Sequence, residues 1–329
     1  MKVGIISFAH GHAYSYTESL VKIKDVELVG IFDEDQKRGT NAAEAYQTSF
    51  FQSYEELLQQ KLDAVVVTSE NAHHAEHAVA AAKSGAAVLC EKPLAHTIED
   101  AKRIIQVCKE EGVMLQTAFP VRFNQVIKRT KQLIEQGEIG EILAMKGTNR
   151  GKNPGGWFND KELSGGGAVI DHTVHVVDIM RWVTGSEVQE VFAEVDQLFT
   201  DTPVDDAGLL TMTFENNVFA TLDCSWSRNE NFPIWGDVTI EFIGTNGTIS
   251  ADAQAQKLDV FQSNGLEYAY WGDDMDEALV QDFINSVKNK TDPSISGTDG
   301  LRALEVAISA YQSAQEKQPV SNSSISTFK

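Results

Sequence analysis

The sequence predicts two domains, an α/β domain in residues 1–120 and an α+β domain in residues 121–329 with a large, mainly antiparallel open sheet. In the first third of the chain, short continuous apolar runs alternate with helical patterns, which is typical of a parallel sheet that is buried on both faces. From residue 188 to residue 263, strand patterns follow one another with turn sequences such as GTNG (244–247) between them. A length of 329 residues is also typical of about two domains.

The expected elements follow from hydrophobic periodicity and from helix and turn signals. In the first domain, strands are expected at 3–6, 26–32, 64–68, 86–90 and 114–117, and helices at 13–23, 75–85 and 98–111. In the second domain, helices are expected at 124–136, 168–184, 274–288 and 298–316, and strands at 142–149, 190–199, 208–215, 218–226, 237–244 and 248–252. Residues 151–167 are rich in glycine and are expected to form a loop.

The composition narrows the range of functions. The chain has 48 acidic and 27 basic residues and a net charge of -21, so a surface for nucleic acid or for an anionic membrane is not expected. No run approaches the ~20 apolar residues of a membrane helix, and the start does not resemble a signal peptide. Three cysteines without a spaced pattern suit a reducing compartment. We therefore expect a cytoplasmic protein.

The loop after the first strand reads Ser7-Phe8-Ala9-His10-Gly11-His12. In a Rossmann-type dinucleotide-binding domain, glycines in this loop let the backbone approach a pyrophosphate. Here Ser7, Ala9 and His12 occupy the glycine positions, and an ordinary strand-to-helix turn is the alternative.

Asp33 ends the second expected strand, where an acid can accept hydrogen bonds from a ribose and would repel a 2′-phosphate. This position favours NAD over NADP. Lys37 and Arg38 keep NADP possible, and a solvated loop acid is the alternative interpretation of Asp33.

A second constellation lies in the segment GGGAVIDHTVHVVDIMRW (165–182). Asp171 and His175 are four residues apart and share one helix face, which Asp178 continues, while His172 lies on an adjoining face. A histidine beside a carboxylate suits proton transfer, and a structural Asp–His pair is the alternative. A metal site is not expected, because these histidines and those at 73, 74 and 77 lack a tight ligand spacing.

Glu91-Lys92-Pro93 ends another apolar strand and places a charged pair at its tip. Together with TSENAHHAEHAVAAAKSG (68–85), the Asp-His segment and GTDGLRALEVAISAYQSAQEKQPV (297–320), this motif makes the chain resemble the Gfo/Idh/MocA oxidoreductases, the family of glucose–fructose oxidoreductase and inositol dehydrogenase. The resemblance runs over nearly the whole chain.

The resemblance implies an NAD(P)-dependent dehydrogenase for a sugar, inositol or related polyol. Lys92 would polarise the substrate oxygen, His175 would take its proton, and Asp171 would hold a neighbouring hydroxyl. The Lys92–Pro93 bond would be cis. The implied cofactor-binding residues are Ser7, Phe8, Ala9, His10, His12, Asp33, Thr68, Ser69, Glu70, His73, Glu91 and Lys92. The implied substrate-binding residues are Arg122, Trp157, Asp171, His172 and His175.

The first loop lacks glycine at positions 7, 9 and 12, and Ser69 and Glu70 replace the Pro and Asn of the family pattern, so the sequence departs from the family where the cofactor would lie. Two other functions stay open. One is a non-catalytic regulator that senses a sugar or a nucleotide. The other is a lyase or glycosidase that recycles its NAD. For the dehydrogenase, a small-molecule sugar or polyol is the expected partner, and the resemblance implies a homodimer or homotetramer formed through the C-terminal sheet.

Overall fold

The structure is a computed structural model that describes residues 1–322. The chain divides into two compact units. Unit 1 contains Met1–Pro120, Leu163–Gly165 and Met275–Leu301. Unit 2 contains Val121–Glu162, Gly166–Asp274 and the chain from Arg302 onward.

Unit 1 is built on a six-stranded sheet in which every neighbouring pair is parallel. Its strands are β1 (Lys2–Ile6), β2 (Glu27–Phe32), β3 (Ser49–Phe51), β4 (Ala64–Val67), β5 (Ala87–Glu91) and β6 (Leu115–Ala118). The order β3-β2-β1-β4-β5-β6 reverses direction between β1 and β4. Ligands of such sheets bind beyond the carboxyl ends of the strands at this switch point.

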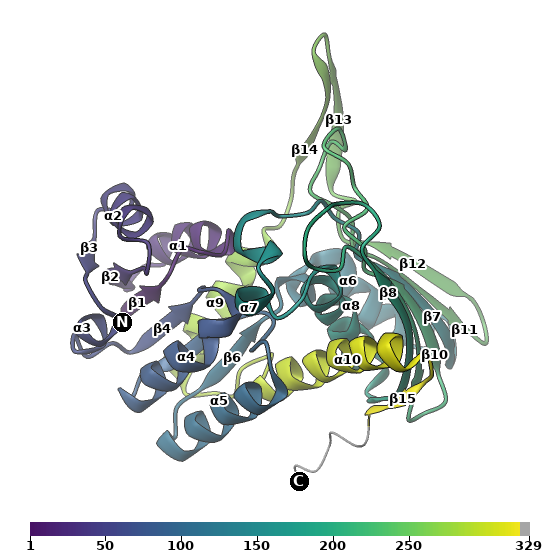
Figure 1. The fold of residues 1–329 in the computed structure, drawn as a ribbon, viewed down its shortest axis with the longest axis horizontal. Helices are drawn as coiled ribbons and strands as arrows, with labels where there is room; N and C mark the ends of the chain where they lie inside the picture. Colours follow the sequence, from purple (N-terminus) through teal and green to yellow (C-terminus); the bar gives the residue numbers. More distant parts are fainter. Residues whose placement is uncertain (323–329) are drawn as a thin grey trace. The chain divides into compact units, whose positions relative to one another are not determined.

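Helices connect these strands (Figure 1). They are α1 (His12–Lys22), α2 (Gln36–Ala45), α3 (Tyr54–Leu58), the 3₁₀ turn η1 (Asn71–His73), α4 (His74–Lys83) and α5 (Ile98–Glu111). A further helix of unit 1, α9 (Met275–Asn289), comes from the later part of the chain and packs against α1. Local chemistry sets their ends. Thr97 caps α5 by accepting from the Asp100 amide, and Gly112 ends it in the left-handed conformation at φ 66°. In the middle of the sheet every residue of β4 and β5 is buried, so the continuous apolar runs are explained by burial on both faces.

Unit 2 is built on a seven-stranded sheet of order β12-β11-β7-β10-β9-β8-β15. Its strands are β7 (Ile142–Thr148), β8 (Val188–Asp196), β9 (Ala207–Phe214), β10 (Phe219–Asp223), β11 (Thr239–Gly244), β12 (Thr248–Asp252) and β15 (Val320–Ser321). The pairing is antiparallel except between β7 and β10, which are parallel. A separate hairpin of β13 (Lys257–Gln262) and β14 (Gly265–Tyr270) projects beyond this sheet in Figure 1.

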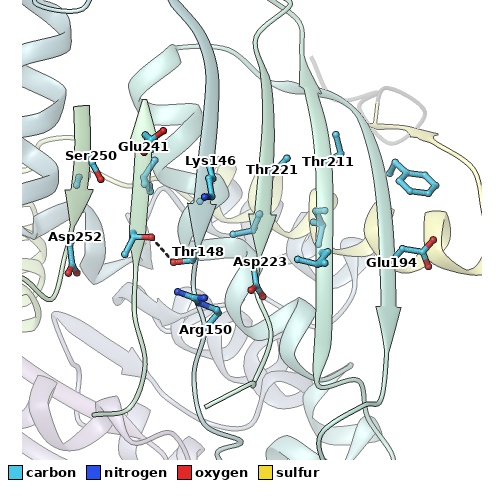
Figure 2. Close-up of a pocket in the computed structure, with 18 residues that line it drawn as sticks. Lys146, Thr148, Arg150, Glu194, Thr211, Thr221, Asp223, Glu241, Ser250 and Asp252 are labelled. Atoms are coloured by element: carbon cyan, nitrogen blue, oxygen red, sulfur yellow. Dashed lines mark hydrogen bonds between the residues drawn. The ribbon is translucent and has the colours of Figure 1, made fainter. Parts of the chain in front are cut away.

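One face of this sheet is covered by α8 (Ala168–Thr184). Gly147 of β7 lets the helix approach, because a side chain there would begin 2.6 Å from Val176 Cγ1. The opposite face is open, and its outward residues, such as Lys146, Thr211 and Thr221, line a shallow groove across the strands (Figure 2). The other helical elements are η2 (Pro120–Phe123), α6 (Gln125–Glu135), η3 (Gly156–Asn159), α7 (Lys161–Ser164) and α10 (Gly297–Glu316).

The fold class predicted from the sequence is confirmed, and helices 98–111 and 168–184 agree with α5 and α8 in both bounds. The sequence did not predict the parallel β7–β10 pair, the β13–β14 hairpin or the short strand β3. The glycine-rich segment 151–167 is also not all loop, since it contains η3 and α7. None of the helices in residues 1–322 combines the length and the apolar character that crossing a membrane requires.

Candidate functional site

The loop between β1 and α1 uses its backbone amides within unit 1. Ser7 has φ 72°, in the region that glycine usually occupies at this turn. The Phe8 amide donates to Asp33 Oδ2 at 2.6 Å, and the His10 amide donates to the Thr68 carbonyl at 3.0 Å. Acceptors within unit 1 receive hydrogen bonds from seven backbone N–H groups of this loop and the start of α1, those of Ser7, Phe8, Ala9, His10, His12, Ala13 and Tyr14. Most of the donors that a glycine loop would offer to a pyrophosphate are therefore already engaged.

Glu91, the last residue of β5, is the centre of a buried polar cluster at this loop. Its Oε1 lies 3.2 Å from Nδ1 of His12 and 3.9 Å from Nε2 of His10, and its Oε2 accepts from the Tyr16 hydroxyl at 2.8 Å. Burial raises the pKa of the Glu91 carboxyl, but His10, the charge and hydrogen bond of His12, and the charge of Lys92 together lower it by more, so its pKa lies well below the usual range. Glu91 is thus a charged anchor for the loop as well as a turn residue.

The Asp33 carboxylate forms hydrogen bonds with other groups of the protein. It accepts from Nε and Nη2 of Arg38 at 2.8 and 2.7 Å, in addition to the Phe8 amide. Arg38 also lies 3.6 Å from Glu70, and Glu70 lies 3.4 Å from Nδ1 of His73. Because the Asp33 side chain is fully buried while Arg38 is 27% exposed, Arg38 is the group of this pair that faces solvent.

Thr68 and Ser69 follow β4 and face the same loop region. The Thr68 hydroxyl donates to the Ser7 carbonyl at 2.7 Å, and Ser69 Oγ lies 3.0 Å from Nδ1 of His77. The Thr68 hydroxyl therefore links the ends of β1 and β4, whereas the Ser69 hydroxyl contacts α4.

Lys92 follows β5 directly and is buried. The Lys92–Pro93 peptide bond is cis, as the resemblance implies. His74 lies behind this turn, with Nδ1 2.9 Å from the Pro93 carbonyl and Nε2 3.0 Å from the Ser69 carbonyl. Burial lowers the pKa of His74 to about 4, so this histidine is neutral and serves to support the turn.

In unit 2, the first half of α8 presents a compact set of buried polar side chains. Asp171, His172 and His175 are 6%, 3% and 8% exposed. Asp171 Oδ2 accepts from Nε1 of Trp226 at 3.3 Å and lies 3.3 Å from Nε2 of His172. The Asn149 amide donates to the His172 carbonyl at 3.1 Å and fixes this turn of the helix. Such a set can bind hydroxyl groups and transfer a proton.

The N-terminus of α8 has no cap from its own sequence, since Gly167 precedes it. Asp205 takes this role, because Oδ1 accepts from the Gly167 amide and Oδ2 from the Val169 amide, both at 2.8 Å. The Tyr311 hydroxyl donates to Asp205 Oδ1 at 2.8 Å and accepts from the Gly167 and Ile170 amides at 3.2 Å. These two residues therefore position the start of the helix that carries Asp171.

Two predicted substrate-binding residues have structural partners in unit 2. Arg122 donates to the Asp178 carboxylate through Nε at 2.6 Å and Nη2 at 2.5 Å, and both side chains are buried. Trp157, in η3, stacks on Phe158 with ring centroids 3.9 Å apart. A role for Arg122 or Trp157 in substrate binding stays a prediction.

The predicted site residues thus form two groups. The predicted cofactor-binding residues all lie in unit 1, where contacts join His10, His12 and Glu91, and likewise Asp33 with Phe8. The predicted substrate-binding residues, including Asp171 and His175, lie in unit 2. The joint action of Lys92 with Asp171 and His175 draws on both units and stays a prediction.

Sequence reasoning missed four residues that shape these groups. Tyr16 lies four residues after His12 on α1, and this spacing could have linked the two. Trp226, Asp205 and Tyr311 reach α8 from distant parts of the chain, and no local sequence signal indicates them.

Comparison with known proteins identifies the family of both parts of the chain. Residues 1–119 match the oxidoreductase family with an NAD-binding Rossmann fold, and residues 127–250 match the GFO/IDH/MocA C-terminal domain. The myo-inositol 2-dehydrogenase of Thermotoga maritima is 30% identical over 97% of this chain and 98% of its own length. The NADP-dependent D-xylose 1-dehydrogenase of Haloarcula marismortui is 29% identical over 78% of this chain and 74% of its own length.

A solved structure shows a similar fold over the whole chain. The crystal structure of a probable dehydrogenase from Thermotoga maritima has a TM-score of 0.86 and 28% identity, and covers 99% of this chain and 100% of its own. The chain therefore belongs to the Gfo/Idh/MocA family of NAD-binding oxidoreductases.

Proposed function

We propose that this dehydrogenase transfers a hydride between the nicotinamide of NAD and a hydroxyl-bearing carbon of a sugar, inositol or related polyol. The observation that carries the proposal is the buried set on α8, in which Asp171 and His175 occupy one helix face and Trp226 donates to Asp171. Carboxylate, imidazole and indole groups in one place suit a substrate with several hydroxyls and an apolar ring face.

In the proposed reaction, an alcohol carbon loses a hydride while its oxygen loses a proton. NAD supplies the hydride acceptor. Lys92 polarises the oxygen and favours its negative charge, and His175 accepts the proton. Asp171 accepts a hydrogen bond from a neighbouring hydroxyl and holds the substrate in place. The reverse reaction uses the same groups in their opposite protonation states.

We propose further that the chain forms a homodimer or homotetramer, with the open face of the sheet in unit 2 as the interface between copies. Its outward residues include Leu209 and Phe219, which are 60% and 55% exposed. An open sheet that exposes large apolar side chains gains stability when a second copy covers it.

The test of catalysis follows nicotinamide absorbance with NAD or NADP and a panel of polyols and sugars. Lys92→Met should lower kcat by about 10²- to 10⁴-fold, because the oxygen loses its charge partner. Lys109→Met is the matched control, because Lys109 is exposed on α5 and should leave kcat unchanged. Tight NAD binding without turnover of any member of the panel would contradict a simple dehydrogenase.

A further inference from the structure

The β1–α1 loop holds an unusual group of side chains where other loops of this fold have glycine. The backbone amides of residues 7–10 and 12–14 donate within unit 1. A diphosphate at this loop carries negative charge and requires hydrogen-bond donors. Side chains must therefore supply most of them, and the loop contributes His10 and His12.

A metal ion is the first alternative explanation of this group. His10, His12 and Glu91 each have a ligand atom, and these atoms lie within 4.8 Å of one another. However, the His12 amide donates to Nδ1 of His10 at 3.1 Å. The neutral His10 ring then carries its hydrogen on Nε2, the nitrogen that faces Glu91, and this nitrogen has no lone pair for a metal. The geometry favours a hydrogen-bonded, charged cluster.

His12 has one nitrogen fixed in this cluster. Its Nδ1 lies 3.2 Å from Glu91 Oε1 and 3.2 Å from the Tyr16 hydroxyl, which itself donates to Glu91 Oε2. Since an ionised carboxylate only accepts, Nδ1 of His12 carries a hydrogen, and Nε2 is the position for a second proton. The His12 side chain is 32% exposed and that of Glu91 is fully buried, so the ring extends from a buried anchor toward solvent.

The surroundings of His12 favour that second proton. Loss of solvent lowers the pKa of His12, and so does the charge of Lys92, but the charge and hydrogen bond of Glu91 and the charge of Asp276 raise it above its ordinary value. Asp276 belongs to α9 and is joined to this turn through Ser15, whose hydroxyl lies 2.6 Å from Asp276 Oδ2 and 3.1 Å from the His12 carbonyl. The charged and titratable groups that face His12 are His10, Tyr16, Glu91, Lys92 and Asp276.

We propose that His12, anchored by Glu91 through Nδ1–H, binds the pyrophosphate of NAD through Nε2–H and takes up a proton from solvent when NAD binds. This role of His12 rests on the proposed NAD-dependent function. It specifies which residue binds the pyrophosphate and predicts that NAD binding is coupled to proton uptake. It assigns Glu91 as a positioning residue, because its carboxylate orients His12 and favours the imidazolium.

The experiment measures the affinity of the full chain for NAD and for ADP-ribose by titration calorimetry from about pH 6 to about pH 9. Above the pKa of His12, affinity should fall by up to about tenfold per pH unit. Buffers of different ionisation enthalpy should show proton uptake that approaches one proton for each ligand bound.

Matched variants test whether His12 is the residue that takes up the proton. His12→Asn should lose the proton uptake and bind NAD roughly 10- to 100-fold more weakly at low pH. His12→Arg should keep the charge and bind NAD without proton uptake. Glu91→Gln should move the pH dependence of NAD affinity to lower pH, and His96→Asn, a histidine outside the loop, should behave as wild type. Circular dichroism confirms that each variant is folded.

The outcomes separate this inference from the proposed reaction. Equal proton uptake by wild type and a folded His12→Asn would overturn the role of His12, while polyol oxidation would still support the dehydrogenase. Proton-linked NAD binding that depends on His12, without turnover of any polyol, would support the role of His12 and contradict the reaction. Absence of NAD binding by the wild-type chain would overturn both.

Discussion

The cap of α8 offers a quantitative test of how the structure positions the predicted substrate site. Tyr311→Phe removes one hydroxyl that accepts from the Gly167 and Ile170 amides and donates to Asp205. Gly167 keeps a shorter bond of 2.8 Å to Asp205, so the net loss is the partner of the Ile170 amide and one donor to a buried carboxylate.

The cost follows from these two losses. An unsatisfied buried amide costs about 1–3 kcal/mol, but the lost bond to Ile170 is long at 3.2 Å, so we take the lower part of this range. Loss of the Tyr311 donor to the Asp205 carboxylate adds about 1.5 kcal/mol, the low end for a hydrogen bond to a charged group. Burial already raises the pKa of Asp205, so this carboxylate depends on its remaining donors. We expect a total destabilisation of about 2–3 kcal/mol.

Urea unfolding of wild type, Tyr311→Phe, Asp205→Asn and the double variant measures this cost and the coupling between the two side chains. The coupling should be at least about 1 kcal/mol, because the residues share a hydrogen bond. Tyr270→Phe is the control, since Tyr270 is 49% exposed on β14 and should change stability by less than about 0.5 kcal/mol. If Tyr311→Phe also stays within about 0.5 kcal/mol of wild type, the cap does not hold α8.

Three other predictions use different parts of the molecule. Burial lowers the pKa of His74 to about 4, so between about pH 7 and about pH 4 the unfolded chain takes up a proton that the folded chain does not. Over this pH range the free energy of unfolding of wild type, measured in urea relative to His74→Gln, should therefore fall by up to about 3 kcal/mol. Glu70→Gln removes a negative charge 3.6 Å from Arg38 and should raise NADP affinity about threefold relative to NAD in calorimetry; an unchanged ratio would contradict this role. Leu209→Arg should dissociate the proposed oligomer in sedimentation velocity, whereas Val21→Arg, a 49% exposed residue of α1, should not.

Much of the fold could be predicted because buried strands and helices have recognisable patterns of apolar residues in the sequence. The strands β4 and β5 are buried throughout and are continuous apolar runs, and α5 has both a threonine cap and a terminal glycine. The β13–β14 hairpin was missed because it has no buried residue, so its sequence lacks the alternation that identifies a strand. The parallel β7–β10 pair joins segments about 75 residues apart, and pairing of this kind leaves no local signal.

In the candidate site, too, features set by neighbouring residues could be predicted, whereas contacts between distant parts of the sequence could not. The Asp171–His175 face was predictable because residues four apart share a helix face. Its hydrogen bond with Trp226 was not, because that residue lies 55 positions away. The sequence places Glu91 at the tip of a strand, and the resemblance places it among the cofactor-binding residues. Its contacts with His12 and Tyr16 exist because β5 and α1 meet at the carboxyl edge of the sheet.

The group around Asp33 bears on the choice between NAD and NADP. Arg38 is the cation that a 2′-phosphate would meet, but two hydrogen bonds already pair it with the buried Asp33 carboxylate. With Glu70 also beside it, one positive charge faces two negative charges. A 2′-phosphate would have to compete for Arg38, and a displaced Asp33 would lose its buried charge partner. The same carboxylate accepts from the Phe8 amide, so NADP could enter only by disturbing the loop that we propose to bind the pyrophosphate. The local geometry therefore gives a physical reason for NAD to be preferred.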